Sequence, residues 1–121
     1  MAERGVMIEF YDCPETDEFN DWLYGPHYDE VFSIIPGVRP IKRYEIMNPA
    51  TPGLQRIVIL LESDDIQAAW NFRTTPRGLR SRLESDVHGL ANREEYYCRL
   101  LYEGHKRDDG TVEGRRIQYD T

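Results

Sequence analysis

The stretch from Thr16 to Gly37 constrains the fold more than any other part of this sequence. Thr16 can cap a helix, acidic residues fill the first turn, and Pro36-Gly37 ends it because proline cannot continue the backbone hydrogen-bond ladder. Four side chains recur at every fourth position and share one helical stripe: Phe19, Leu23, His27 and Val31. The pattern predicts a helix that directs a histidine toward its own core.

Two interpretations of His27 remain open. The ring is either a packed core histidine with one satisfied nitrogen, or a group that faces a pocket. Tyr24, Tyr28 and Asp29 crowd the same turn. They favour an interpretation in which His27 belongs to a polar site.

Gly25-Pro26 interrupts this helix. A proline inside a helix lacks an amide donor and clashes with the carbonyl four residues back, here that of Trp22, so we expect a kink or a restart. If the helix restarts, Pro26 occupies its first position and His27 lies in its first turn, where the positive end of the helix favours a neutral imidazole. Asp29 and Glu30 act in the opposite direction, so the sequence leaves both charge states of the ring open.

Four strands and a second helical region complete the pattern. A turn cluster over 48–53 precedes a continuous apolar run at 56–61, which predicts a central strand. Helical spacing continues over 66–73 and, after Pro76, up to Leu90 through an apolar stripe of Leu79, Leu83 and Val87. The remaining strands are expected at 6–11, 38–47 and 94–102. The order is βαββαβ, which predicts an α+β, ferredoxin-like plait with its helices on one face of an antiparallel sheet.

The uncovered face of this sheet predicts an assembly. The strands carry apolar residues on both faces, so we expect two copies to pack sheet against sheet as a homodimer and form an α+β barrel. We expect residues 1–103 to form this domain. The charged, glycine-containing segment 104–121 has little to bury and is expected to be an extended or disordered arm.

Charge and composition exclude several functions. A net charge of −7 argues against nucleic acid or an anionic membrane as partner. The N-terminal residues lack a secretion-signal pattern and no apolar run approaches the ~18 residues of a membrane span, so we expect a cytoplasmic protein. Cys13 and Cys98 lack metal-ligand spacing and no glycine-rich loop follows a strand, so we expect neither a metal nor a nucleotide cofactor.

A family resemblance rests on the first helix and the strand after it. The run Phe19-Asn20-Asp21-Trp22-Leu23-Tyr24, then His27, Val31, Ile34 and Pro36-Gly37-Val38, with Arg43-Tyr44 beyond, resembles the dimeric α+β barrel superfamily, in particular its EthD-like members. The resemblance covers roughly residues 5 to 102. Two departures are visible: Pro26 stands where an acidic residue often precedes the histidine, and 74–79 lacks the histidine that plant polyketide cyclases place there.

The resemblance implies a cofactor-independent protein that acts on a small hydrophobic or aromatic molecule, as polyketide cyclases, isomerases and lyases of this superfamily do. In the resulting hypothesis His27 takes a carbon-bound proton, Tyr44 or Tyr24 hydrogen-bonds the developing enolate, and Asp29 orients the imidazole. The expected substrate-binding residues are Trp22, Leu23, Tyr28 and Trp70. Two alternatives stay open: a cofactor-free monooxygenase of phenolic substrates, and a non-catalytic binding or accessory protein.

Overall fold

The computed structural model of the chain describes residues 3–48, 52 and 54–119 and contains an antiparallel four-stranded sheet with the order β2-β3-β1-β4. Its strands are β1 (Gly5–Pro14), β2 (Val38–Glu45), β3 (Leu54–Ser63) and β4 (Ala91–Arg99). This is the predicted ferredoxin-like α+β architecture, and the apolar run at 56–61 lies in a central strand as expected. Most of the predicted turn over 48–53 lies outside the described residues.

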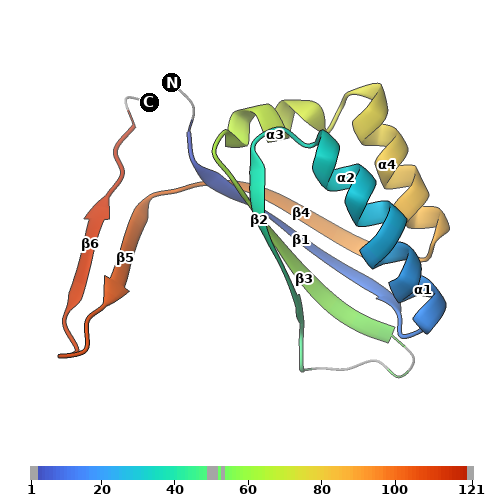
Figure 1. The fold of residues 1–121 in the computed structure, drawn as a ribbon, viewed down its shortest axis with the longest axis horizontal. Coiled ribbons are helices and arrows are strands. Elements are labelled where there is room, and N and C mark those ends of the chain that lie inside the picture. Colours follow the sequence, from blue (N-terminus) through green and yellow to red (C-terminus); the bar gives the residue numbers. More distant parts are fainter. Residues whose placement is uncertain (1–2, 49–51, 53, 120–121) are drawn as a thin grey trace.

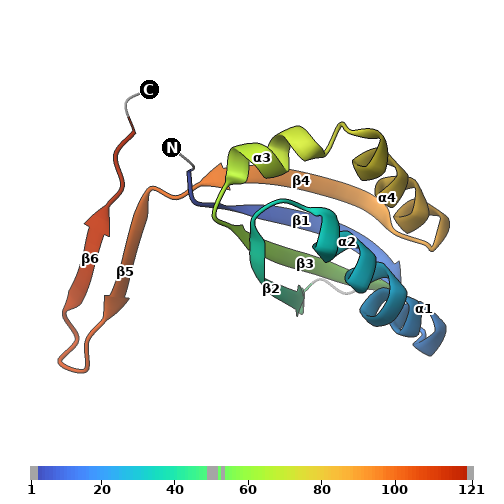
Figure 2. The same cartoon turned by 45° about the horizontal axis from the view of Figure 1, so that its top comes forward.

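All helices lie on one face of the sheet and leave the other face bare (Figures 1 and 2). They are α1 (Asp17–Trp22), the π-helical turn η1 (Leu23–His27), α2 (Tyr28–Ile34), α3 (Ile66–Phe72) and α4 (Pro76–Val87). Thr16 caps α1 as predicted, since its hydroxyl accepts a hydrogen bond of 3.1 Å from the Phe19 amide. Within the described residues no helix is long and apolar enough to cross a membrane.

The core lies between the helices and the sheet. Alternate residues of the two central strands point into it: Met7, Tyr11 and Cys13 of β1, and Ile57, Ile59 and Leu61 of β3. Phe19, Leu23, Ile66, Ala69 and Leu90 pack against them from the helical side. Because side chains alternate along a strand, the intervening residues Val6, Ile8, Phe10, Val58 and Leu60 lie on the bare face.

Several strand ends differ from the sequence-based expectation. Residues 12–14, predicted as a turn, continue β1 and pair with the start of β3. The last sheet strand ends at Arg99 instead of Tyr102, and Tyr102 begins β5 (Tyr102–Lys106), which pairs with β6 (Val112–Arg116) in a separate hairpin. All residues of both hairpin strands are exposed, and the hairpin projects away from the sheet (Figure 1).

Pro26 is accommodated by a widened turn in which the backbone stays helical. The Tyr28 amide donates to the Leu23 carbonyl, five residues back, as in a π-helix, and Pro26 has no amide to place. His27 therefore ends the π-turn and does not lie in the first turn of a new helix. Leu23 and His27 both face the core, as the stripe predicted.

The orientation of α4 runs against the usual rule that the apolar face of a helix is buried. Its apolar stripe lies in solvent, with Leu79, Leu83 and Val87 exposed by 50%, 65% and 83%. The inward face carries Gly78 and Ser85, which are buried, and Ser81 and Arg82, which are half-buried. Gly78 is needed there because a Cβ would lie 2.5 Å from the Phe72 carbonyl oxygen. The helix thus presents polar groups to the interior, against the hydrophobic pattern of its own sequence.

Candidate active site

A cavity of about 90 Å³ lies between the helices and the sheet, next to this polar face of α4. Its wall is mostly apolar along α2, β3 and α3, where Val31, Phe32, Ile35, Ile59 and Phe72 line it. The other end is polar and is lined by His27, Glu9, Glu95, Arg82, Arg93 and Ser85. Ligand sites are usually larger, at about 300–1,000 Å³, so the cavity admits only a small molecule unless α2 and α4 move apart.

His27 occupies this wall as a buried, neutral ring. It is 8% exposed, and burial together with the positive charges of His88 and Arg93 lowers its pKa to about 4. An imidazole with that pKa is uncharged at pH 7. It can therefore accept a proton, although more weakly than a free imidazole does.

The hydrogen bonds of Ser85 fix which ring nitrogen is the acceptor. Its hydroxyl donates to the Ser81 carbonyl at 3.1 Å, so at 3.3 Å it accepts from the Nε2–H of His27. This tautomer follows from the hydrogen-bond network and leaves the lone pair on Nδ1. Nδ1 is buried and has no hydrogen-bond partner among the described residues.

The indole of Trp22 holds the ring from one side. Trp22 stacks on His27 with centroids 4.4 Å apart and on the exposed His88 with centroids 3.8 Å apart. This three-ring stack, with Ser85, fixes the plane of His27.

Two carboxyl groups face each other at the polar end. Glu9 of β1 and Glu95 of β4 are direct cross-strand partners, so their side chains leave the sheet side by side. Burial, followed by the hydrogen bond and the charge of Glu95, raises the pKa of Glu9 to about 8, while Arg93 and Arg82 oppose the shift. At pH 7 Glu9 is therefore a neutral carboxylic acid, an O–H donor inside the cavity.

Two arginines accompany this pair. Arg82 of α4 forms an ion pair with Glu95, and Arg93 bonds Asp86 at 3.3 Å at the rim. The Nε of Arg93 is buried without a hydrogen-bond partner among the described residues. Both guanidinium groups favour the ionised form of Glu9 and so oppose the effect of its burial.

The sequence-predicted site residues are only partly gathered here. Leu23 and Tyr28 line the cavity with His27, and burial raises the pKa of the Tyr28 phenol. Tyr24 is 55% exposed and accepts a 2.7 Å hydrogen bond from Arg43, while Asp29 lies in solvent. Neither lines the cavity.

The other predicted residues lie further away. Tyr44 pairs with Val58 on the bare face of the sheet, and its neighbour Arg43 is the residue that faces the helices, where it also donates to the Tyr11 hydroxyl at 3.3 Å. Trp22 contacts His27 but is not part of the cavity wall. Trp70 is 41% exposed and packs on Tyr97 and Arg73.

Glu9, Glu95, Arg82 and Arg93 are the site residues that sequence reasoning missed. One signal was available for Glu9: it alternates with Met7 and Tyr11, so a carboxyl stands on the same strand face as two core residues. The others depend on the register of β4 and the rotation of α4, which the sequence pattern did not indicate.

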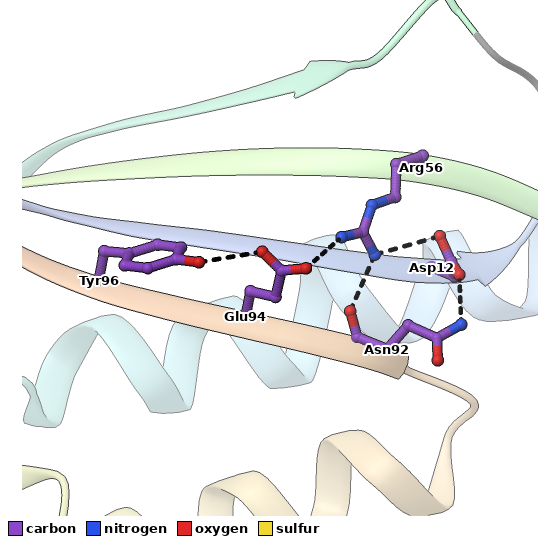
Figure 3. A network of polar contacts seen from close by, with 5 residues as sticks. All are labelled: Asp12, Arg56, Asn92, Glu94 and Tyr96. Atoms are coloured by element: carbon purple, nitrogen blue, oxygen red, sulfur yellow. Dashed lines mark hydrogen bonds and ion pairs between the residues drawn. The ribbon is translucent and has the colours of Figure 1, made fainter.

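A second polar cluster lies on the bare face, at the end of the sheet (Figure 3). Arg56 bonds the Asn92 carbonyl at 2.8 Å and Asp12 at 3.3 Å, and the Asn92 amide donates to Asp12 at 2.6 Å. Glu94 joins Arg56 to the Tyr96 hydroxyl. These polar groups satisfy one another where β4 has one extra residue opposite the stretch from Phe10 to Asp12. The cluster belongs to the sheet end and not to the cavity.

Comparisons with known proteins support the fold. No family model and no curated protein matches the sequence. Among solved structures, an EthD family protein from Bacillus halodurans matches with a TM-score of 0.54 and 19% identity over 77% of this chain and 96% of its own. The hydroxynitrile lyase from Passiflora edulis matches with a TM-score of 0.54 and 15% identity over 79% of this chain and 94% of its own. At these identities the likeness shows the fold alone, and that fold is the ferredoxin-like α+β plait predicted from the sequence.

Proposed function

We propose that this chain is a cofactor-independent enzyme that takes a carbon-bound proton from a small, largely apolar substrate, with His27 as general base. One observation carries the proposal. A buried neutral imidazole lines the cavity, and its lone pair on Nδ1 has no partner among the residues that the structure describes. Buried acceptors are normally paired, so an unpaired one beside a cavity indicates a place for a ligand.

The inverted face of α4 supports the same proposal. Solvating Leu79, Leu83 and Val87 forgoes burial worth about 1.5–3 kcal/mol for each large side chain, while Arg82 and Ser85 are directed inward. The rule that the apolar face of a helix is buried is broken here at this cost, and such exceptions are typical of functional sites. The lyase among the solved structures of this fold is a precedent for small-molecule chemistry on it.

Within this class we propose isomerisation or lyase chemistry. The three-ring stack would also be found around a packed histidine in a binding protein. The test must therefore distinguish an enzyme with His27 as base from a binding protein. The cavity beside the unpaired Nδ1 favours the enzyme, because a buried acceptor without a protein partner is costly unless a ligand can reach it.

A direct test follows the exchange of carbon-bound hydrogen for deuterium in D₂O by proton NMR, with nitroethane as a small carbon acid. We expect the wild-type protein to accelerate exchange and His27→Ala to lose about 10²- to 10⁴-fold, the usual contribution of a positioned base. His105→Ala is the matched control, because it removes a histidine from the exposed strand β5, outside the cavity lining, and should retain the rate. Equal rates in wild type and His27→Ala would leave a binding protein as the better account.

A further inference from the structure

The carboxyl and guanidinium groups at the polar end of the cavity have no role in proton abstraction by His27. It holds two carboxyl groups and two guanidinium groups, donated by β1, β4 and α4, on a chain that otherwise directs apolar side chains into this layer. All four groups are half-buried. Removing ionisable groups from water is costly, and hydrophobic residues of the same volume would be at least as stable. The cost of keeping this cluster indicates that it has a function.

The geometry points to a further catalytic residue: we propose that Glu9 donates a proton to the carbonyl oxygen of the substrate while His27 takes the α-hydrogen, so that the substrate class is a small carbonyl compound with an enolisable hydrogen. This inference rests on the proposed function and names its substrate class. Glu9 and His27 line the same cavity, and the charge of Arg93 acts on both groups.

The proposed step balances in protons and electron pairs. The C–H bond breaks, its proton goes to Nδ1 of His27, and its electron pair forms the carbon–carbon double bond of an enol. The carbonyl π pair forms the new O–H bond with the proton of Glu9, which is left as a carboxylate. Return of the proton from His27 to another carbon of the conjugated enol, with return of the oxygen proton to Glu9, completes an isomerisation.

The surroundings of Glu9 accommodate both its protonated form and its ionised form. Before the step, Glu9 carries its proton and Glu95 is ion-paired with Arg82. After the step His27 carries the proton that it has taken, so three positive charges balance three negative ones. The positive groups are Arg82, Arg93 and His27, and the negative groups are Glu9, Glu95 and Asp86. The environments push the pKa of His27 down and that of Glu9 up, which is the pattern of an assigned base and acid.

The experiment compares two carbon acids, cyclopentanone and nitroethane, in wild type and Glu9→Gln. An enolate oxygen is basic enough to take the proton of Glu9, whereas a nitronate oxygen is too weak a base to take it. We expect Glu9→Gln to lower cyclopentanone exchange at least about 100-fold and nitroethane exchange only a few-fold. Glu9→Asp keeps the carboxyl group and should restore part of the cyclopentanone rate.

A second readout does not depend on turnover. In protein labelled with ¹³C at glutamate carboxyls, the Glu9 signal is assigned by its absence in Glu9→Gln and should shift when cyclopentanone is added. Two results would overturn the role of Glu9: an equal loss of exchange rate for cyclopentanone and nitroethane in Glu9→Gln, or a Glu9 signal that does not shift when cyclopentanone is added. His27-dependent exchange of nitroethane would then still uphold the proposed function. Failure of wild type to exchange nitroethane above His27→Ala overturns the proposed function itself, even where the Glu9 signal responds to the ketone.

Discussion

At the scale of the residue, the site consists of two ionisable groups, and their surroundings lower the pKa of His27 and raise the pKa of Glu9. Burial disfavours the charged form of each, so His27 stays without its extra proton and Glu9 keeps its proton at neutral pH. The sequence predicted that His27 lies on an inward-facing stripe, and the structure confirms it. This was predictable because the spacing of residues along a helix determines which side chains share a face. It did not predict Glu95 and Arg93 beside Glu9, because cross-strand register depends on the whole sheet.

Glu9 should make the folding stability depend on pH. Its pKa is raised in the folded state, so its contribution is fully present below the unfolded pKa of about 4.5 and is lost as the pH rises through about 8. The groups that set this balance are Glu95, Arg93 and Arg82, with Tyr11 and Tyr97 beside them. Glu9→Gln removes the titration, and we expect its stability relative to wild type to rise by on the order of 3 kcal/mol between pH 5 and pH 8.

Urea unfolding at the two pH values measures this difference. Glu62→Gln, at an exposed position of β3, is the matched control and should show no such trend. A constant difference between Glu9→Gln and wild type would mean that Glu9 is ionised in the folded protein at pH 7.

At the scale of the element, two helices place the site by departing from regular behaviour. The π-turn at Pro26 keeps His27 on the core side, and α4 turns its polar face inward. The sequence indicated the first departure, because proline and glycine interrupt a helix for local reasons. The apolar stripe of α4 does not mark its buried face, because the rule that apolar stripes are buried fails where polar groups line the interior.

Pro26→Ala should separate stability from function. The new amide can donate to a carbonyl of the preceding turn, so we expect the π-turn to relax toward an α-helix and Tm to rise by a few degrees. Four residues of an α-helix turn by about 400°, whereas the wider π-turn covers the same four residues with a smaller rotation, so the relaxation changes the direction of the His27 side chain relative to the cavity. Exchange of nitroethane should therefore fall while the protein becomes more stable.

Gly25→Ala is the matched control for this variant. A Cβ at Gly25 meets no atom within 4 Å, so the alanine should add about 0.5–1 kcal/mol of helix stability and keep the π-turn. The idea that the π-turn positions His27 fails if both variants retain the same exchange rate.

At the scale of the whole molecule, the bare face of the sheet remains to be covered. It carries Val6, Ile8, Phe10, Val58 and Leu60, flanked by the half-exposed rings of Tyr44 and Tyr96. We propose that two copies pack through this face, as expected from the sequence. The plait itself was predictable because each strand and helix follows its own local pattern, whereas the β5–β6 hairpin was not, because it buries none of its residues.

Leu60→Lys tests this assembly. Leu60 lies on a central strand in the middle of the bare face, so a lysine there would have to lose hydration in a sheet-to-sheet interface. In light scattering coupled to size-exclusion chromatography we expect a dimer for wild type and a folded monomer for Leu60→Lys. Leu83→Lys, the same substitution on the solvent face of α4, should stay dimeric. A monomeric wild type would contradict the proposed barrel.

The central claim, that His27 is a neutral ring facing a ligand cavity, is tested most directly by ¹⁵N NMR of the histidine rings during a pH titration, with His27→Ala for assignment. We predict that His27 stays neutral with its proton on Nε2 until the pH approaches about 4, and that its Nδ1 signal shifts when cyclopentanone is added. A ring that titrates near the ordinary pKa of about 6.5, or that does not respond to the ketone, would contradict the account.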